Sequence, residues 1–171
     1  METFLMYTVI ILIVTQAISF ILILRLRKGV TTAELSLGTA IPSIKAFSFT
    51  HNKQVVVKKL IRKPTLIVFV TPHSRACRKL LEECRLSYNQ NEGMLDLISI
   101  VIGGEPEGRK LLKDVMMPGE HLWDPTKEVF HQFGVQIVPY AFAVNKNGVI
   151  EDKGVCGTKE QIDILTEPLF Q

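Results

Sequence analysis

The stretch KPTLIVFVTPHSRACRKLL, from Lys63 to Leu81, decides the fold that the sequence predicts. Its first part, Thr65 to Val70, is an apolar run rich in β-forming residues and short enough for a strand buried on both faces. Its second part begins at Arg75 and carries apolar residues at helical spacing beside charged ones, which indicates an amphipathic helix to Tyr88. Ser74 is the predicted N-cap of this helix, because a serine hydroxyl accepts a hydrogen bond from the first turn.

Cys77 lies in the first turn of the predicted helix. Backbone N–H groups and the positive end of the helix dipole favour a thiolate there. The segment from Phe69 to Arg78 resembles the active-site segment of thioredoxin-like proteins, including the membrane-anchored redoxins of the MauD and TlpA type. Those redoxins carry a pattern of the form F-V-S-P-x-C-x-x-C-K. Cys77 matches the second cysteine of this pattern, whereas Ser74 stands at the place of the first.

The resemblance extends from Gly38 to the end of the chain and implies a thioredoxin-like α/β fold, with a mixed sheet flanked by helices. In this family a cis-proline precedes a strand and lies against the active-site turn, and its neighbours bind extended peptide. Val138 and Pro139 match that position, so the resemblance implies that Pro139 is cis and that both residues bind a client polypeptide. His73 directly precedes the first cysteine position and is either a further substrate-binding residue or an exposed residue of the turn.

The other elements follow from periodicity and turn residues. The sequence predicts hairpin turns at Asn52-Lys53 and Asn147-Gly148, and a short helix that Asp124 caps. The full predicted order is an initial short strand, strand 54–57, strand 65–70, helix 75–88, strand 95–102, helix 105–115, helix 124–133, strand 135–145, strand 149–155 and helix 159–165, capped by Thr158. Parallel crossovers followed by a hairpin suit a mixed sheet with helices on both faces.

Residues 4–24 carry no charge and are mostly apolar. At ~1.5 Å per residue they are long enough to cross a hydrocarbon core of ~30 Å. No basic residue precedes them, unlike in a signal peptide, so we expect an uncleaved membrane anchor. The predicted organisation is a transmembrane anchor with a basic flank (residues 1–28), a linker (29–37) and the thioredoxin-like domain (38–171).

Two arguments give opposite orientations for this predicted single-pass protein of the cell membrane. Arg25, Arg27 and Lys28 follow the apolar run and Glu2 precedes it, which by the positive-inside rule places the domain in the cytoplasm. The resemblance implies the extracytoplasmic side, where the related anchored redoxins generally work. The sequence leaves both orientations open.

The cysteines limit the chemistry, because ordinary thiol–disulfide exchange needs two neighbouring thiols. The chain has three: Cys77, Cys84 and Cys156. Cys77 and Cys84 lie about 10 Å apart along one predicted helix, more than the ~7 Å that a disulfide allows between Cα atoms. The sequence does not fix the distance from Cys156 to Cys77. A dithiol oxidoreductase is therefore disfavoured.

Three roles of Cys77 stay open. The first is a lone redox thiol, whose pKa Arg75, Arg78 and the helix N-terminus would lower. The second is an inert buried thiol at the family's resolving position. The third is a peroxidatic thiol. The last role fits the sequence least, because the peroxiredoxin pattern P-x-x-x-T-x-x-C is not matched: Pro72 is misplaced and the threonine is missing.

Other classes of site lack their sequence signals. The four histidines have no metal-ligand spacing with the cysteines, so no metal site is expected. A glycine-rich phosphate loop is absent, and no run of Lys and Arg is interleaved with aromatic residues, so we expect neither a cofactor nor a nucleic-acid partner.

These observations predict a membrane-tethered thioredoxin-like protein that assists the redox maturation of a partner protein, with an atypical S-x-x-C motif. The expected partner is a client polypeptide or a thiol–disulfide protein. A redox-inactive binding or assembly module on the same fold is the first alternative. Peroxiredoxin-like antioxidant activity is the second.

Overall fold

The structure is a computed structural model of the chain and describes residues 14–16, 19, 34–91 and 93–171. Residues 14–16 and 19 are helical and belong to the first of two compact units, residues 1–33. The predicted anchor, residues 4–24, falls largely outside the described residues, and no helix within the described ranges is long and apolar enough to cross a membrane. The second unit, residues 34–171, forms the domain and includes residues 34–37 of the predicted linker.

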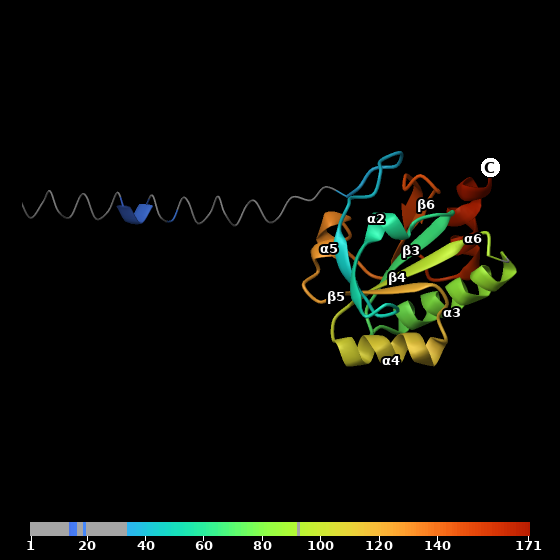
Figure 1. Cartoon of the computed structure of the whole chain (residues 1–171), viewed down its shortest axis with the longest axis horizontal. Coiled ribbons are helices and arrows are strands. Elements are labelled where there is room, and N and C mark those ends of the chain that lie inside the picture. Colours follow the sequence, from blue (N-terminus) through green and yellow to red (C-terminus); the bar gives the residue numbers. More distant parts are fainter. Residues whose placement is uncertain (1–13, 17–18, 20–33, 92) are drawn as a thin grey trace, which may run out of the picture. The chain divides into compact units, whose positions relative to one another are not determined.

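A seven-stranded mixed sheet forms the centre of the second unit (Figure 1). The order across the sheet is β2-β1-β5-β4-β3-β6-β7; the pairings of β4 with β3 and with β5 are parallel, and all other pairings are antiparallel. This confirms the predicted mixed sheet. The strands are β1 (Lys45–Ser48), β2 (Lys53–Val56), β3 (Thr65–Val70), β4 (Asp96–Ile102), β5 (Glu120–Asp124), β6 (Tyr140–Val144) and β7 (Ile150–Gly154).

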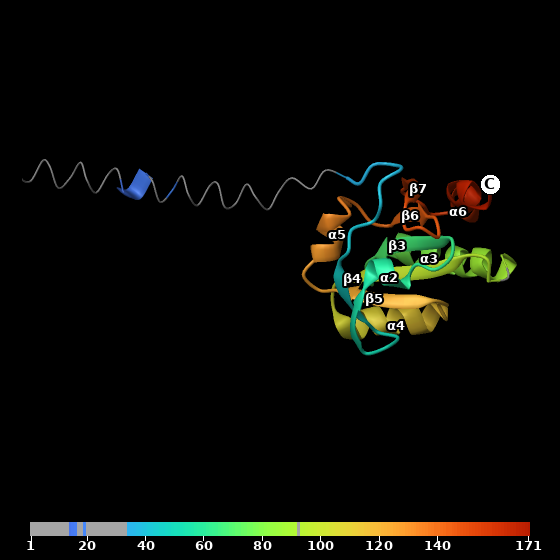
Figure 2. The ribbon, with the colours of Figure 1, turned by 45° about the horizontal axis from the view of Figure 1, so that its top comes forward.

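Helices cover both faces of the sheet, as predicted (Figures 1 and 2). One face carries α3 (Arg75–Gln90), α4 (Glu105–Val115) and α6 (Lys159–Thr166), whose buried residues share one core cluster. The other face carries α2 (Val57–Leu60) and α5 (Glu128–Gln132), whose buried residues belong to a second cluster. A 3-10 helix, η1 (Glu167–Phe170), follows α6.

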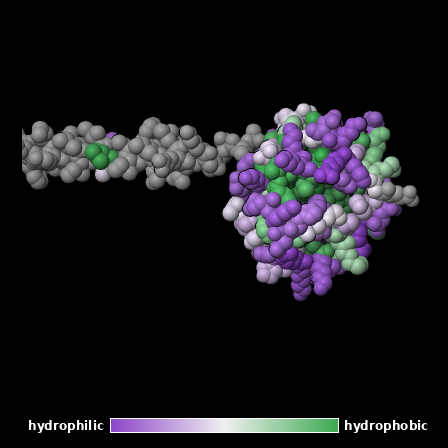
Figure 3. All heavy atoms as spheres, in the orientation of Figure 1, coloured by the Kyte–Doolittle hydropathy of each residue, from purple (hydrophilic) through white to green (hydrophobic). Residues whose placement is uncertain are grey.

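The central strand β3 supplies both halves of the core. Leu66, Val68 and Val70 belong to the cluster beneath α3, α4 and α6, whereas Ile67 and Phe69 belong to the cluster beneath α2 and α5. Successive side chains of a strand point to opposite faces, and both faces are covered here, so all six residues of β3 are buried. Hydrophilic side chains cover most of the face of the domain seen in Figure 3.

The predicted cap of the last helix is confirmed. The Thr158 hydroxyl oxygen accepts a hydrogen bond from the Gln161 backbone N–H at 3.4 Å. The Gln161 side chain reaches back and accepts from the Gly157 N–H at 2.8 Å. The two side chains thus satisfy two backbone N–H groups at the start of the helix. The pattern differs from a capping box in that Gln161 accepts from the residue before the N-cap and not from the N-cap itself.

The prediction of a helix from Asp124 to Phe133 was wrong in its first half. Residues 120–124 form strand β5, and the helix α5 begins only at Glu128, after Lys127 in a left-handed conformation. Asp124 is buried at the end of β5, where its Oδ2 accepts a hydrogen bond from the Phe130 N–H at 2.9 Å. Asp124 therefore satisfies a backbone donor of the first helical turn as a cap would, but from the neighbouring strand.

Two strand boundaries also differ from the predictions. Val57, expected to end a strand, begins helix α2 and is fully buried. The strand expected over residues 135–145 is limited to Tyr140–Val144, because the segment before it bends at Pro139, which has no N–H to donate to a strand ladder.

Candidate functional site

The turn between β3 and α3 places Ser74 at the helix N-cap. Its hydroxyl oxygen accepts a hydrogen bond from the Cys77 backbone N–H at 3.2 Å, and its carbonyl oxygen accepts from the Arg78 N–H at 3.1 Å. The backbone of Ser74 is extended, as an N-cap requires. The predicted cap is confirmed, and the Ser74 hydroxyl is already engaged within the protein.

Cys77 is 0% exposed. It lies on the same face of α3 as the buried residues Leu80, Leu81 and Cys84, which follow it at intervals of three, four and seven residues. This face packs into the core cluster beneath α3, α4 and α6. In this structure the Cys77 thiol has no contact with solvent, which matches the buried thiol among the three roles that the sequence left open.

Pro139 follows a cis peptide bond from Val138, as the resemblance implied. β3 and β6 pair with Phe69 opposite Tyr140, so the next step of the antiparallel register sets Pro139 opposite Val70. Val70 is the residue from which the chain enters the Ser74 turn. The fold therefore brings the cis-proline to the same end of the sheet as the N-terminus of α3.

Val138 and His73 border this end of the sheet in different ways. Val138 is half-buried and packs against the core cluster that contains Cys77. His73 is exposed within the turn, whose hydrogen bond runs from the Ser74 N–H to the Thr71 carbonyl at 3.4 Å. Among the described residues, no hydrogen bond or ion pair occupies the His73 ring, so the ring is available to a bound ligand.

The other two thiols are also buried, Cys84 at 0% and Cys156 at 2% exposure. Burial raises the pKa of Cys84, with smaller contributions from Cys156 and Glu83. Burial and, to a lesser degree, the Asp152 carboxylate raise the pKa of Cys156 to about 11. Both thiols are therefore protonated near neutral pH and poor nucleophiles, because only the thiolate attacks a disulfide.

Three interacting polar residues, of which Tyr140 directly follows Pro139, were missed by the sequence predictions. The Tyr140 hydroxyl donates a hydrogen bond to Glu34 Oε1, and Lys153 Nζ lies 3.1 Å from the same oxygen. The Tyr140 hydrogen bond lowers the pKa of Glu34, whereas burial and the Glu34 carboxylate raise the pKa of Tyr140. The position of Tyr140 directly after Pro139 could have identified it as a site residue from the sequence. Glu34 lies in the predicted linker, where no sequence feature marked it.

In residues 34–91 and 93–171, no exposed thiol lies at this end of the sheet. His73 is exposed there and Ser74 is half-buried, whereas cis-Pro139 and Cys77 are buried. Within the part of the chain that the structure describes, no group of three His, Cys, Asp or Glu side chains could hold a metal ion.

Curated relatives are similar to this chain over its middle part. The methylamine utilization protein MauD of Methylobacillus flagellatus is 36% identical over 105 residues, which are 61% of this chain and 50% of that protein. MauD of Methylophilus methylotrophus is 34% identical over 107 residues, 63% of this chain and 49% of that protein. The chain thus spans about half the length of the curated relatives it matches.

Solved structures share the fold at low sequence identity. A thiol:disulfide interchange protein DsbE from Chlorobium tepidum aligns with a TM-score of 0.71 at 15% identity, over 80% of this chain and 97% of that one. The thioredoxin domain of a thiol-disulfide oxidoreductase from Bacteroides vulgatus aligns with a TM-score of 0.66 at 17% identity, over 78% and 99%. The thioredoxin-like fold is thereby confirmed.

A family model describes the largest part of the chain. The model of the AhpC/TSA family matches residues 37–153, from just before the first strand into the last one. This range contains the Ser74 turn, Cys77 and the cis-proline. The chain belongs to the AhpC/TSA family of thioredoxin-like, redox-related proteins.

Proposed function

We propose that this protein assists the maturation of a partner protein by holding a client polypeptide at the surface formed by the Ser74 turn, His73 and cis-Pro139. We further propose that Ser74 occupies the position of the first cysteine of the related redoxins, and that residues 4–24 tether the domain to a membrane. The likeness to MauD proteins and to thiol-disulfide oxidoreductases supports a role in redox-related maturation.

The burial of the thiols carries this proposal. All three cysteines lie within the described residues, at exposures of 0%, 0% and 2%. A thiol must reach the client to attack its disulfide, and a serine hydroxyl cannot take over, because exchange passes through a mixed disulfide. At this end of the sheet, His73 is exposed and Ser74 and Val138 are half-buried around the buried cis-Pro139. We propose that these residues bind a chain and do not oxidise or reduce it.

The position of Cys77 favours a second candidate, a lone-thiol redox role. Cys77 lies in the first turn of α3, so opening that turn alone would expose its thiol. The thiolate would attack a disulfide of the partner, form a mixed disulfide and release one partner thiol. A second thiol of the partner would then attack the mixed disulfide, which restores Cys77 and leaves a new disulfide in the partner. A peroxidatic role needs the same exposure, since peroxide must reach the sulfur.

Site-specific photocrosslinking in cells tests the client-binding proposal. A photoreactive amino acid at His73 should yield a discrete adduct with one partner protein, because this side chain borders the proposed surface. The matched control places the same group at Lys110, which is exposed on α4 on another part of the domain. The adduct at position 73 should weaken several-fold when Val138→Asp adds a charge beside the cis-proline. Adducts of equal yield from positions 73 and 110 would contradict the proposal. An adduct at position 73 whose yield does not change with Val138→Asp would also contradict it.

A further inference from the structure

A pocket lies at the opposite end of the sheet from Ser74. It has a volume of about 460 Å³, within the ~300–1,000 Å³ range of small-molecule sites. Asp96 and Glu120, the first residues of β4 and β5, border it. β3, β4 and β5 run parallel, so their first residues lie at one end of the sheet and their last residues at the other. The pocket borders the first residues, whereas the Ser74 turn follows the last residue of β3. The two sites are therefore separated by the length of a strand, ~20 Å.

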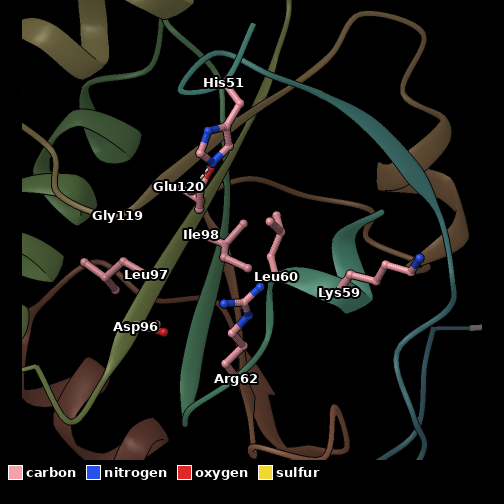
Figure 4. A pocket seen from close by; sticks show the side chains of 9 residues that line it. All are labelled: His51, Lys59, Leu60, Arg62, Asp96, Leu97, Ile98, Gly119 and Glu120. Carbon is pink, nitrogen blue, oxygen red and sulfur yellow. Dashed lines mark hydrogen bonds and ion pairs between the residues drawn. The ribbon is translucent and has the colours of Figure 1, made fainter. Parts of the chain in front are cut away.

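Arg62 supplies the charge of this pocket. Figure 4 shows its guanidinium pointing from the segment after α2 toward the middle of the pocket, next to the side chain of Leu60. Among the described residues, no carboxylate or carbonyl oxygen pairs with this guanidinium. Lys59 stands at the rim, and its ammonium points away from the centre. It likewise has no ion-pair partner in the described part of the chain.

The two carboxylates of the pocket are engaged with other residues. Glu120 Oε1 lies 2.8 Å from His51 Nε2 (Figure 4), and Glu120 Oε2 is buried without a hydrogen-bond partner in the described ranges. Asp96 Oδ1 lies 3.9 Å from Lys63 Nζ. Within the described residues, Arg62 and Lys59 are therefore the charged side chains of the pocket that no hydrogen bond or ion pair engages, and both are positive.

An apolar wall completes the pocket. Ile98 of β4 lies at its centre in Figure 4, and Leu60 of α2 faces it from the other side. Ile98 is almost fully buried and fixed within the sheet, whereas Leu60 is half-buried. A ligand that reaches Arg62 would cover this apolar surface as well, and the burial of apolar area would add to its affinity.

We propose that this pocket binds a small carboxylate with an apolar body, such as an aromatic or branched aliphatic acid. The planar guanidinium of Arg62 matches a carboxylate through two parallel hydrogen bonds, and the wall of Leu60 and Ile98 takes the apolar part. The site is separate from the client-binding surface and does not depend on the function proposed for it.

Methyl NMR on the full-length chain tests this inference with benzoate as the probe and benzamide as its neutral counterpart. Benzoate should shift the methyl signals of Ile98 and Leu60 in a saturable manner. Benzamide should bind at least about tenfold more weakly, because a charge-assisted pair contributes more than a neutral hydrogen bond. Arg62→Gln should weaken benzoate binding by a similar factor. Lys58→Gln, which removes one charge from the preceding helix α2 outside the pocket, should leave it unchanged.

Inorganic phosphate separates a carboxylate site from a general anion site. The proposal predicts that phosphate binds more weakly than benzoate, because it cannot use the apolar wall. Equal binding of benzoate and benzamide would overturn the role of Arg62, and equal binding of phosphate and benzoate would overturn the ligand class. If Arg62→Gln were misfolded, Arg62→Lys provides the second variant, with weakened binding expected since the flat guanidinium fork is lost. Unchanged binding in that variant would contradict the proposed geometry.

Discussion

Ser74 performs a structural task as the N-cap of α3. Its hydroxyl oxygen accepts the Cys77 N–H, and its carbonyl oxygen accepts the Arg78 N–H, so one residue starts the helix that buries the remaining thiol. A cysteine sulfur is a weaker hydrogen-bond acceptor than a hydroxyl oxygen. A serine at this position therefore caps α3 more strongly than a cysteine would.

Ser74→Ala should lower the free energy of unfolding by ~1 kcal/mol, because it leaves the Cys77 N–H without its acceptor. Ser74→Asp should retain most of the stability, since an aspartate caps equally well. Urea denaturation of the two variants beside the wild type measures the difference. A loss of the same size in both variants would show that the cap is not the cause.

At the residue scale the sequence predicted the cap and, through the resemblance, the cis-proline, but it left the burial of Cys77 open. One signal for that burial was available. Cys77 precedes Leu80, Leu81 and Cys84 by three, four and seven residues, the spacing of a single helix face. Ala76, one residue before Cys77, is exposed, so the buried face of α3 begins at the cysteine.

At the level of elements, helix α4 packs closely on the sheet at Gly108. A Cβ added to Gly108 would lie 2.8 Å from Val101 Cγ1 and 3.6 Å from a ring carbon of Phe49. Gly108→Ala should therefore destabilise the protein by roughly 1–3 kcal/mol through overpacking, although alanine is the better helix former by ~1 kcal/mol. Thermal or urea denaturation measures the change.

A double-mutant cycle with Val101→Ala identifies the cause. Removing the Val101 methyl groups makes room for the new side chain, so Gly108→Ala should cost much less in that background. If Gly108→Ala is as damaging without the valine methyl groups as with them, the close contact between α4 and β4 is not what selects glycine.

His121 links the stability of β5 to pH. Its Nδ1 lies 2.7 Å from Ser99 Oγ and its Nε2 lies 3.0 Å from the Met117 carbonyl oxygen. Burial lowers the pKa of His121 below its ordinary 6.5. The unfolded chain therefore takes up this proton at a higher pH than the folded chain does. The resulting stability is fully present above about pH 6.5 and is lost as the pH falls toward the folded pKa.

His121→Gln should reduce the pH dependence of unfolding between pH 7.5 and 5. Glutamine keeps polar contacts to the same neighbours but cannot titrate, so less stability is lost on acidification than in the wild type. Urea titrations at several pH values provide the comparison. His131→Gln is the control, because His131 is exposed on α5. An unchanged slope in His121→Gln would contradict the assignment.

At the scale of elements the long periodic segments were predictable and the short ones were not. β3, β4, α3 and α4 carry unbroken patterns and were predicted within about two residues. β5 contains both His121 and the buried Asp124, so its sequence lacks the apolar run that marks a buried strand. Its strand state depends on pairing with β1 and β4, which are distant in sequence. Local propensity contains no information on such contacts.

On the scale of the whole molecule, the domain carries different chemistry at its two ends. We propose that the end with Ser74 and cis-Pro139 binds a polypeptide and that the end with Arg62 binds a small anion. The sequence resemblance could predict the polypeptide-binding end, because the residues that match the family's active-site and cis-proline patterns lie there. It could not predict the other end, since Arg62, Glu120 and Ile98 come together only through the sheet order. The membrane anchor over residues 4–24 stays a prediction.

The accessibility of Cys77 tests the central claim, that this thioredoxin-like domain holds a client without an exposed thiol. The measurement is alkylation of the full-length, folded chain with N-ethylmaleimide across pH, with mass-spectrometric assignment of each cysteine. The control is a Ser74→Cys, Cys77→Ala variant, which carries a cysteine at position 74. Native Cys77 should react at least about a hundredfold more slowly than this control thiol, because its reaction requires opening of α3. In denaturant, Cys77 should react at its full rate. Reaction of native Cys77 within about threefold of that control thiol would contradict the account and establish the lone-thiol redox role instead.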